Sequence, residues 1–158
     1  MDPDLTTARR CGTCSLCCEL LAVAALDKAE NVPCVHASRC GLGCAIFDTP
    51  ERPAACSAYQ CAWLFNESWP ESLRPDRCGV VFEPFAQDER LCFTANVSLD
   101  NPEAWKTGAA AAAIQKMVGD GCSVIVVVGK MKHVVMPEGQ TPAGVWDLYE
   151  QAARQAWQ

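Results

Sequence analysis

Cysteine is the residue type with the most reactive chemistry in this sequence. The short segment CGTCSLCC holds the C-x-x-C spacing twice, at Cys11/Cys14 and at Cys14/Cys17, with Cys18 directly behind. This spacing lets two sulfur atoms approach one metal ion across a tight turn. Gly12 lets the backbone wrap so that its amides point at thiolate sulfur. The segment therefore predicts coordination of a metal ion by thiolates.

The candidate ligands continue beyond this segment. The chain of 158 residues contains 12 cysteines, and most of them lie in its first half. Because a zinc ion takes four thiolate or imidazole ligands in a tetrahedral arrangement, the set is large enough for two ions. We expect the metal ligands to be Cys11, Cys14, Cys17, Cys18, Cys34, Cys44, Cys56 and Cys61, with Cys40, Cys78 and His36 as further candidates.

The adjacent pair Cys17 and Cys18 bears on the number of metal ions. In an extended chain, neighbouring side chains point to opposite sides. Two such thiols do not complete one tetrahedron comfortably, so we expect Cys17 and Cys18 to serve two different ions, or one of them to bridge two ions. The pair thus favours more than one metal site.

The N-terminal residues and the net charge limit the cellular compartment and the classes of partner. The first residues, MDPDLTTARR, show no apolar stretch followed by small residues, so no signal peptide is expected, and the protein is predicted to be soluble and cytoplasmic. In that reducing compartment, clustered cysteines favour metal binding over a disulfide framework. The net charge of −6, without a block of Lys or Arg, argues against nucleic acid or a membrane as a partner. Metal ions are the partners that the sequence predicts, and a protein partner that binds the second half of the chain stays an open alternative.

A second segment with cysteines at both ends lies downstream. The stretch from Cys44 to Cys56 reads CAIFDTPERPAAC. Together with CGTCSLCC it resembles the YkgJ-like cysteine-cluster family, the zinc- or iron-chelating domain named for its CxxCxxCC motif, with one inserted residue before the Arg-Pro pair. The resemblance covers roughly residues 11 to 82 and implies metal binding without naming a reaction. Cys40 and Cys78 fall outside the shared pattern.

Zinc is expected rather than iron because of the ligand spacing. A ferredoxin-type iron–sulfur run ends C-x-x-C-x-x-C-x-x-x-C-P, whereas here the fourth cysteine follows the third at once and no proline comes after it. Four-coordinate thiolate sites are closed to substrates, so a structural or metal-handling role is favoured over an enzyme, and no catalytic residues are assigned. The alternative is an iron or iron–sulfur protein with a redox, sensing or accessory-enzyme role.

Helices and strands must hold this cysteine set in place. The sequence of the second half of the chain predicts such elements. Apolar runs of strand length predict strands, a cap residue before proline predicts each helix start, and glycines predict the first helix end. The resulting order is ββαββα, expected as a small antiparallel sheet with both helices on one face. The predicted elements are a strand from Val80, a strand over 91–97, a helix from Asn101 to about Val118, strands over 123–128 and 132–136, and a helix from Pro142 capped by Thr141.

The fold class is therefore expected to be α+β in two parts. Residues 1–78 form an irregular, metal-stapled, cysteine-rich module. Residues 79–158 form the α+β core packed against it, either as a separate part or within one continuous domain. Cys92 and Cys122 lie in apolar strand patterns and are expected in the core. Arg52 is expected to fix a turn through backbone carbonyls or an acidic neighbour, and a substrate-binding role is the alternative.

Overall fold

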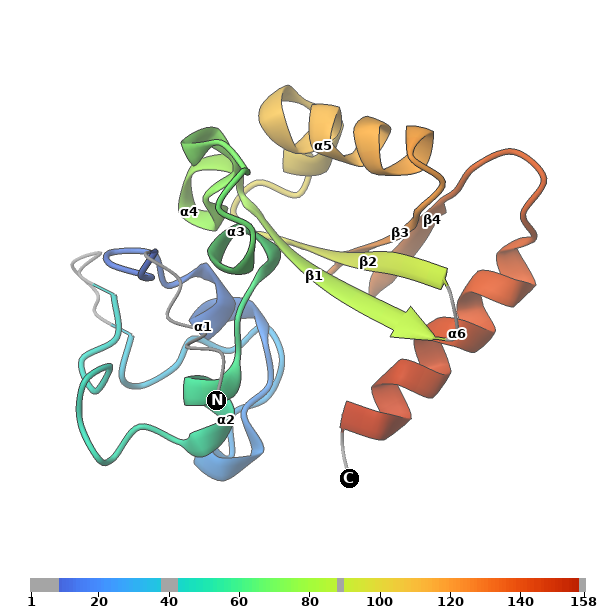
Figure 1. The fold of residues 1–158 in the computed structure, drawn as a ribbon. Helices are drawn as coiled ribbons and strands as arrows, with labels where there is room; N and C mark the ends of the chain where they lie inside the picture. The colour runs from blue at the N-terminus through green and yellow to red at the C-terminus, as the bar shows by residue number, and fades with distance from the viewer. Residues whose placement is uncertain (1–8, 38–42, 88–89, 157–158) are drawn as a thin grey trace, which may run out of the picture.

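The computed structural model describes residues 9–37, 43–87 and 90–156 and shows a mixed α+β architecture, as the sequence predicts (Figure 1). The first half of the chain forms short helices joined by loops, and the second half forms a four-stranded sheet with two longer helices. Within the described ranges, the α-helices and strands in chain order are α1 (Leu16–Leu20), α2 (Ala54–Ala58), α3 (Ala62–Phe65), α4 (Pro75–Cys78), β1 (Val80–Gln87), β2 (Arg90–Val97), α5 (Gly108–Gly119), β3 (Ser123–Val128), β4 (Met131–Val135) and α6 (Pro142–Ala156).

The sheet has the strand order β1-β2-β3-β4 and confirms the predicted element order ββαββα. β1 and β2 form an antiparallel pair, with Val80 opposite Val97, and β3 and β4 form another. β2 and β3 are parallel, with Phe93 opposite Val124, so the prediction of an antiparallel sheet is wrong at this pair. The connection between these two strands carries α5 back across the sheet, and such a crossover returns the chain in the same direction.

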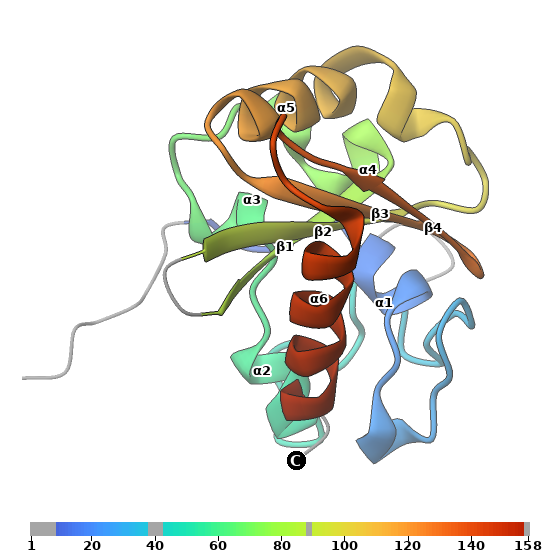
Figure 2. The ribbon, with the colours of Figure 1, turned by 90° about the vertical axis from the view of Figure 1, so that its right-hand side faces the viewer.

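Helices α5 and α6 lie on opposite faces of the sheet, and the prediction that both lie on one face is wrong (Figures 1 and 2). Val124 and Val126 of β3 belong to the same buried cluster as Ile114 of α5. On the other face, Tyr149 of α6 meets Phe85 of β1 edge to face, with ring centroids 6.2 Å apart. β3 is apolar at consecutive positions, which is typical of a strand covered on both faces.

Helix α5 begins at Gly108, several residues after the Asn101 start that the sequence predicts. The intervening segment forms a short 3-10 turn around Trp105 instead. Ala104 is buried in the core, and Trp105 stacks on His133 of β4 with ring centroids 5.5 Å apart. These contacts keep the segment on the sheet and delay the start of the helix.

Helix α6 begins at Pro142, as predicted. The Gly144 N–H donates a hydrogen bond of 3.4 Å to Thr141 Oγ1, so Thr141 caps the first turn. Val145 is buried, and it belongs to the apolar stripe that the sequence predicts for this helix. The second face of the sheet is therefore covered from the first turn of α6 onward.

The two halves of the chain share one hydrophobic cluster. Leu16 and Leu20 of α1 and Trp63 of α3 belong to the same cluster as Val80 and Phe82 of β1. Because burial of apolar surface is the main favourable term in folding, this cluster fixes the cysteine-bearing loops onto the sheet. The division of the chain between residues 78 and 79 stays a prediction.

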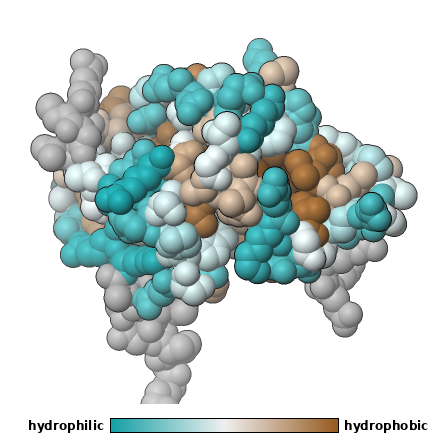
Figure 3. All heavy atoms as spheres, turned by 90° about the horizontal axis from the view of Figure 1, so that it is seen from above, coloured by the Kyte–Doolittle hydropathy of each residue, from teal (hydrophilic) through white to brown (hydrophobic). Residues whose placement is uncertain are grey.

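Figure 3 shows the face of the molecule above α4 and α5, where hydrophilic side chains dominate and apolar ones gather towards the side of β3, β4 and α6. Leu99 and Met131 are among the large apolar side chains that are exposed. In the ranges that the structure describes, no helix is both long enough and apolar enough to cross a membrane.

Candidate metal centre

One cavity of about 450 Å³ collects the cysteine side chains that the sequence analysis selects. Its walls come from α1, from the loops that follow it, from α2 and α3, and from Glu83 of β1. Every cysteine in the described ranges is a free thiol. The thiols that line the cavity belong to Cys11, Cys14, Cys17, Cys18, Cys34, Cys44, Cys56 and Cys61, and His36 lies in the same wall.

Backbone hydrogen bonds bring the cysteine segments together. The Cys14 N–H donates to the Cys11 carbonyl across 2.9 Å and closes the first C-x-x-C turn. The Cys34 N–H donates to the Cys18 carbonyl across 2.9 Å, which joins the second loop to α1. Two segments that are distant in the sequence therefore present their thiols to the same space.

The segment that leads into Cys44 reaches the first turn through a contact between glycines. Gly43 has φ +83°, and a Cβ atom placed on it would lie 2.1 Å from the Gly12 carbonyl oxygen. No side chain fits at that distance, and an L-residue would also be strained at that φ. Gly43 therefore lets the Cys44 segment approach the first turn closely.

Backbone amides donate to two of the buried sulfur atoms. The Cys14 sulfur accepts from the N–H groups of Leu16 and Asp76, and the Cys61 sulfur accepts from amides in the first turn of α3. Burial nevertheless raises the pKa of Cys14 to about 11 and raises the pKa of Cys61. Because the thiolate is the form that binds metal, these ligands stay neutral until an ion replaces the proton.

The prediction that Cys17 and Cys18 point to opposite sides is wrong. Both residues lie in α1, where successive side chains are about 100° apart, and both line the cavity. The Cys17 thiol donates a hydrogen bond to the Cys18 sulfur, which raises the pKa of Cys17 above its usual range and is the largest cause that lowers the pKa of Cys18 to about 7. Lys28 and Arg52 lower the pKa of Cys18 further.

Four of the thiols lie close to the hydrophobic core and form what we call the inner group. Cys61 belongs to the core cluster, Cys11 and Cys17 pack against it, and Cys14 is buried beside Cys61. Burial and then repulsion by Cys61 raise the pKa of Cys11, and Cys18 makes a smaller contribution in the same direction. The inner group consists of Cys11, Cys14, Cys17 and Cys61.

The other four thiols form what we call the outer group, which lies among the loops. Burial and then repulsion by Cys18, with smaller contributions from Cys34 and Cys44, raise the pKa of Cys56. The outer group therefore consists of Cys18, Cys34, Cys44 and Cys56. The adjacent pair is divided between the groups, with Cys17 in the inner one and Cys18 in the outer one.

A buried lysine stands beside the outer group. Lys28 is only 8% exposed, and its Nζ donates to the Leu21 carbonyl and, across 3.2 Å, to the Ala29 carbonyl. Burial lowers the pKa of Lys28, whereas the nearby Cys34 and Cys18 thiolates raise it. A buried ammonium at this place offsets the negative charge that thiolates bring into the cavity.

Arg52 supplies a second positive charge and confirms its predicted structural role. Its guanidinium donates to the Cys56 carbonyl across 2.9 Å and to the Phe47 carbonyl across 3.4 Å. The guanidinium carbon also lies 4.0 Å from the centroid of the Phe47 ring. Arg52 thus holds the turn that carries Cys56 and places a cation beside the outer group.

The thiols line the walls of the cavity without meeting at one point. Within the described residues, no three His, Cys, Asp or Glu side chains are spaced so that they hold one ion as they stand. In a tetrahedral thiolate site the metal–sulfur distance is about 2.3 Å. Binding therefore requires rotation of thiol side chains about χ1 and closure of the loops around the ion.

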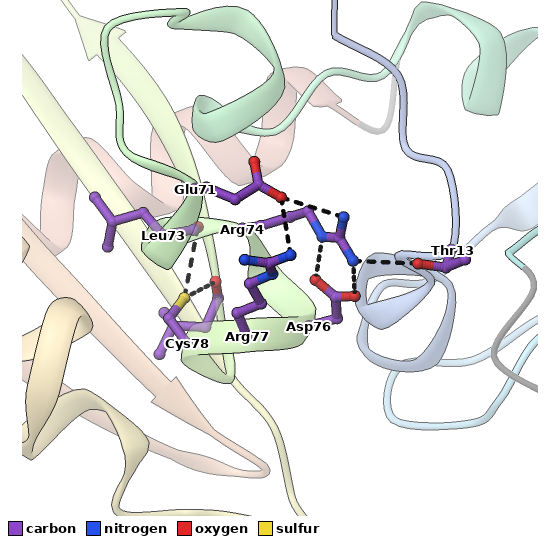
Figure 4. Close-up of polar contacts among 8 residues, drawn as sticks. Thr13, Glu71, Leu73, Arg74, Asp76, Arg77 and Cys78 are labelled. Carbon is purple, nitrogen blue, oxygen red and sulfur yellow. Dashed lines mark hydrogen bonds and ion pairs between the residues drawn. The ribbon is translucent and has the colours of Figure 1, made fainter.

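The additional candidates are placed less favourably. Cys40 lies outside the described residues. Cys78 does not line the cavity: its Sγ lies 3.6 Å from the Leu73 carbonyl oxygen and 3.3 Å from the Val80 carbonyl oxygen, two acceptors that share its one S–H (Figure 4). Cys78 lines a separate hollow next to α5 instead. Cys92 is buried as predicted, whereas Cys122 is only partly buried.

A charged network fixes α4 against the first cysteine turn (Figure 4). Arg74 donates through Nε and Nη2 to the two Asp76 carboxylate oxygens, each across 2.6 Å. The same Nη2 donates to Thr13 Oγ1 across 3.1 Å. Because Thr13 stands between Cys11 and Cys14, this network helps to position the inner group.

Glu83 was not predicted from the sequence, and among the described residues it is the only cavity wall residue that comes from the sheet. Its carboxylate is largely buried, accepts a hydrogen bond of 3.0 Å from Asn96 Nδ2, and has its pKa raised by burial. The signal available in the sequence was a glutamate inside the apolar run of β1. Lys28 carried no comparable signal, because lysine in a loop is ordinarily exposed.

Comparison with known proteins gives no further guidance. No protein-family model matches the chain, and no match is found among curated proteins or among solved structures. The resemblance to the YkgJ-like cysteine-cluster family therefore stays a hypothesis based on the motifs.

Proposed function

We propose that this chain is a cytoplasmic metal-binding protein that coordinates two or more zinc ions through its clustered cysteine thiolates. The observation that carries the proposal is the common cavity. The eight cysteines predicted from spacing and from the family resemblance line it as free thiols although they come from separate segments of the chain. The inner and outer groups each offer four sulfur ligands, the number that zinc takes in closed sites.

The surroundings of the thiols support the same proposal. Amide N–H groups aimed at the Cys14 and Cys61 sulfur atoms stabilise a thiolate, and Lys28 and Arg52 offset the charge of the outer group. In closed four-thiolate sites the ions have no open position, so the role is structural or concerned with metal handling. Metal ligation then replaces part of the hydrophobic core that the loops lack.

An iron or iron–sulfur protein with a redox, sensing or accessory-enzyme role is the second candidate. The amide–sulfur hydrogen bonds favour it as well, because such bonds also tune the potentials of iron–sulfur clusters. The two candidates make different predictions for colour. Zinc thiolates are colourless in the visible range, whereas iron–sulfur clusters are brown.

The test is anaerobic purification without added metal, followed by elemental analysis and ultraviolet–visible spectra of the same sample. We expect a colourless protein with about two zinc ions per chain. Cys122→Ser, outside the cavity, should keep the full metal content. Brown protein that contains iron and inorganic sulfide would contradict zinc binding and support the iron–sulfur candidate. Less than one metal ion of any kind per chain would overturn the proposal.

A further inference from the structure

The inner and outer groups differ in how they are attached to the hydrophobic core. In the inner group Cys14 and Cys61 are buried, whereas the four outer thiols are each only partly buried. Helix α3, which follows Cys61, buries three of its four residues and packs on β1. Helix α2, which carries Cys56, buries none of its residues and lies at the end of the cysteine-bearing half that points away from the sheet (Figures 1 and 2). Movement of α2 therefore exposes little apolar surface.

Hydrogen bonds from distant parts of the chain hold the inner group in place. The Arg9 guanidinium donates to the Trp63 carbonyl of α3 across 2.8 Å and lies 4.5 Å from the centroid of the Trp63 ring. The Arg74 guanidinium donates to Thr13 Oγ1 across 3.1 Å, within the first cysteine turn. Both the helix after Cys61 and the first turn are thus fixed by contacts between distant segments.

Local turns hold the segment of the outer group between Cys44 and Cys56. The N–H groups of Phe47 and Thr49 each donate to the carbonyl three residues earlier. At the start of the segment, the Ala45 N–H donates to the His36 carbonyl across 2.8 Å, which joins one outer loop to another. These bonds shape the loops without tying them to the sheet.

The loop that carries Cys34 is attached to α1 mainly through its backbone. The Cys34 N–H donates to the Cys18 carbonyl across 2.9 Å. Both chain neighbours of Cys34 are exposed, and one of them, Val35, is an apolar residue with 87% of its surface open to solvent. Segments that bury few apolar side chains open locally at a lower cost in free energy than segments of the core. The outer loops are therefore able to open while the core stays closed.

We propose that the outer group exchanges its metal ion with competing ligands, whereas the inner group retains its ion as a structural part of the fold. The inference rests on the proposed metal binding and gives each site a different role: the chain passes on one ion and keeps the other. During exchange, each Zn–S bond that breaks is replaced by a bond from the ion to the competing ligand. The released sulfur takes back from solution the proton that it lost on binding.

Excess EDTA, added to the metal-loaded chain, serves as the competing ligand, and native mass spectrometry counts the ions that remain on each molecule over time. We expect the first ion to leave at least about 100-fold faster than the second, because release of the second exposes apolar side chains of the core. The one-ion form should therefore accumulate, and it should keep the near-ultraviolet circular dichroism to which the buried Trp63 contributes. Two ions that leave at one rate would overturn this inference but not metal binding, whereas a chain purified without metal would overturn both.

Serine variants assign the two rates to the two groups. Cys56→Ser should hold one ion that leaves only slowly, and Cys14→Ser should hold one ion that leaves fast. Cys122→Ser, which does not alter the cavity, should show both rates. The reverse assignment, or the loss of both ions from either cavity variant, would contradict the proposal.

Two apolar truncations distinguish retention by the core from retention by the loops. Leu64→Ala shortens a buried side chain of α3, and we expect the slow rate to rise about tenfold or more while the fast rate stays the same. Val35→Ala shortens an exposed side chain beside the outer ligand Cys34 and should leave both rates unchanged. An unchanged slow rate in Leu64→Ala would show that the core does not retain the inner ion. The two rates of the wild-type chain decide the question even if this variant folds poorly.

Discussion

Arg74 Nη2 lies 3.1 Å from Thr13 Oγ1 and so connects α4 to the turn between the first two cysteines (Figure 4). The same guanidinium is held by Asp76, whose backbone N–H donates to the Cys14 sulfur. A residue far along the chain is thus coupled to the inner group through direct hydrogen bonds.

We expect Arg74→Ala to lower the free energy of unfolding by about 2 kcal/mol, since charge-assisted hydrogen bonds contribute roughly 1.5–3 kcal/mol. Urea titration of the metal-loaded protein measures this change. Arg77→Ala is the matched control: its guanidinium is more exposed and pairs with Glu71 at 3.5 Å, so less than about 0.5 kcal/mol should be lost. Equal losses in the two variants would show that the contact with Thr13 contributes nothing.

The same network predicts a pH dependence. The hydrogen bonds and charge of Arg74 hold the pKa of Asp76 below its ordinary value of 3.8. A carboxyl group with a lower pKa in the folded state contributes stability that is present above its unfolded pKa and is lost as pH falls through the folded pKa. The wild-type chain should therefore exceed Asp76→Asn in stability at pH 6, and the difference should shrink below about pH 4.

Comparing the two chains at each pH removes the effect of thiolate protonation for every thiol except Cys14, whose pKa the Asp76 charge also raises. Urea titrations between pH 6 and pH 3 give the difference directly. A difference that stays constant over this range would show that Asp76 acts through its shape or backbone and not through its charge.

Arg9 offers a test of how α3 is held. Its guanidinium donates to the carbonyls of Trp63, Asn66, Glu67 and Trp69 at 2.5–2.9 Å, and it lies 4.5 Å from the centroid of the Trp63 ring. Arg9→Lys should lose about 2 kcal/mol of stability, because a single ammonium does not reproduce the planar fork that serves four acceptors.

The neighbouring Arg10 serves as the control for Arg9. It pairs with Asp48 at 2.7 Å, but both side chains are well exposed, so Arg10→Ala should cost less than about 0.5 kcal/mol. Thermal or urea unfolding distinguishes the two variants. If Arg9→Lys unfolds like the wild type, the fork on α3 is unimportant and the cation over Trp63 is sufficient.

The inner and outer groups can be separated by metal analysis of paired variants. Cys14→Ser should remove about one ion, and adding Cys61→Ser should remove no more, because both residues serve the inner site. Combining Cys14→Ser with Cys56→Ser should remove both ions, with Cys122→Ser as the unaffected control. Loss of all metal from every single variant would mean that the eight thiols hold one shared cluster.

The cysteine set was predictable because its signal is local. The C-x-x-C spacing limits how far apart two sulfur atoms can lie, so Cys11, Cys14 and Cys17 could be grouped without knowledge of the fold. The orientation of the Cys17–Cys18 pair was not predictable from adjacency, because it depends on whether the backbone is extended or helical. The short helix α1 gives the pair its common orientation.

In the fold, too, the features set by neighbouring residues were predictable, and the features set by contacts between distant segments were not. The order ββαββα followed from apolar runs and helix signals along the chain, and it is confirmed. The parallel pairing of β2 with β3 and the opposite faces of α5 and α6 depend on the path of the crossover, which no local pattern records. Glu83 and Lys28 were not predicted for a related reason, since only the folded chain places Glu83 in the cavity wall and Lys28 near Cys18 and Cys34.

The contact between Gly43 and Gly12 sets a condition on any chain that shares this arrangement. Without a side chain at position 43, the Cys44 segment can reach the first turn; with even one methyl group there, the two segments would be forced apart. A library randomised at this codon and selected for metal retention should return glycine alone. A search pattern built from cysteine spacing would accept sequences that fail this condition, and adding the glycine would exclude them.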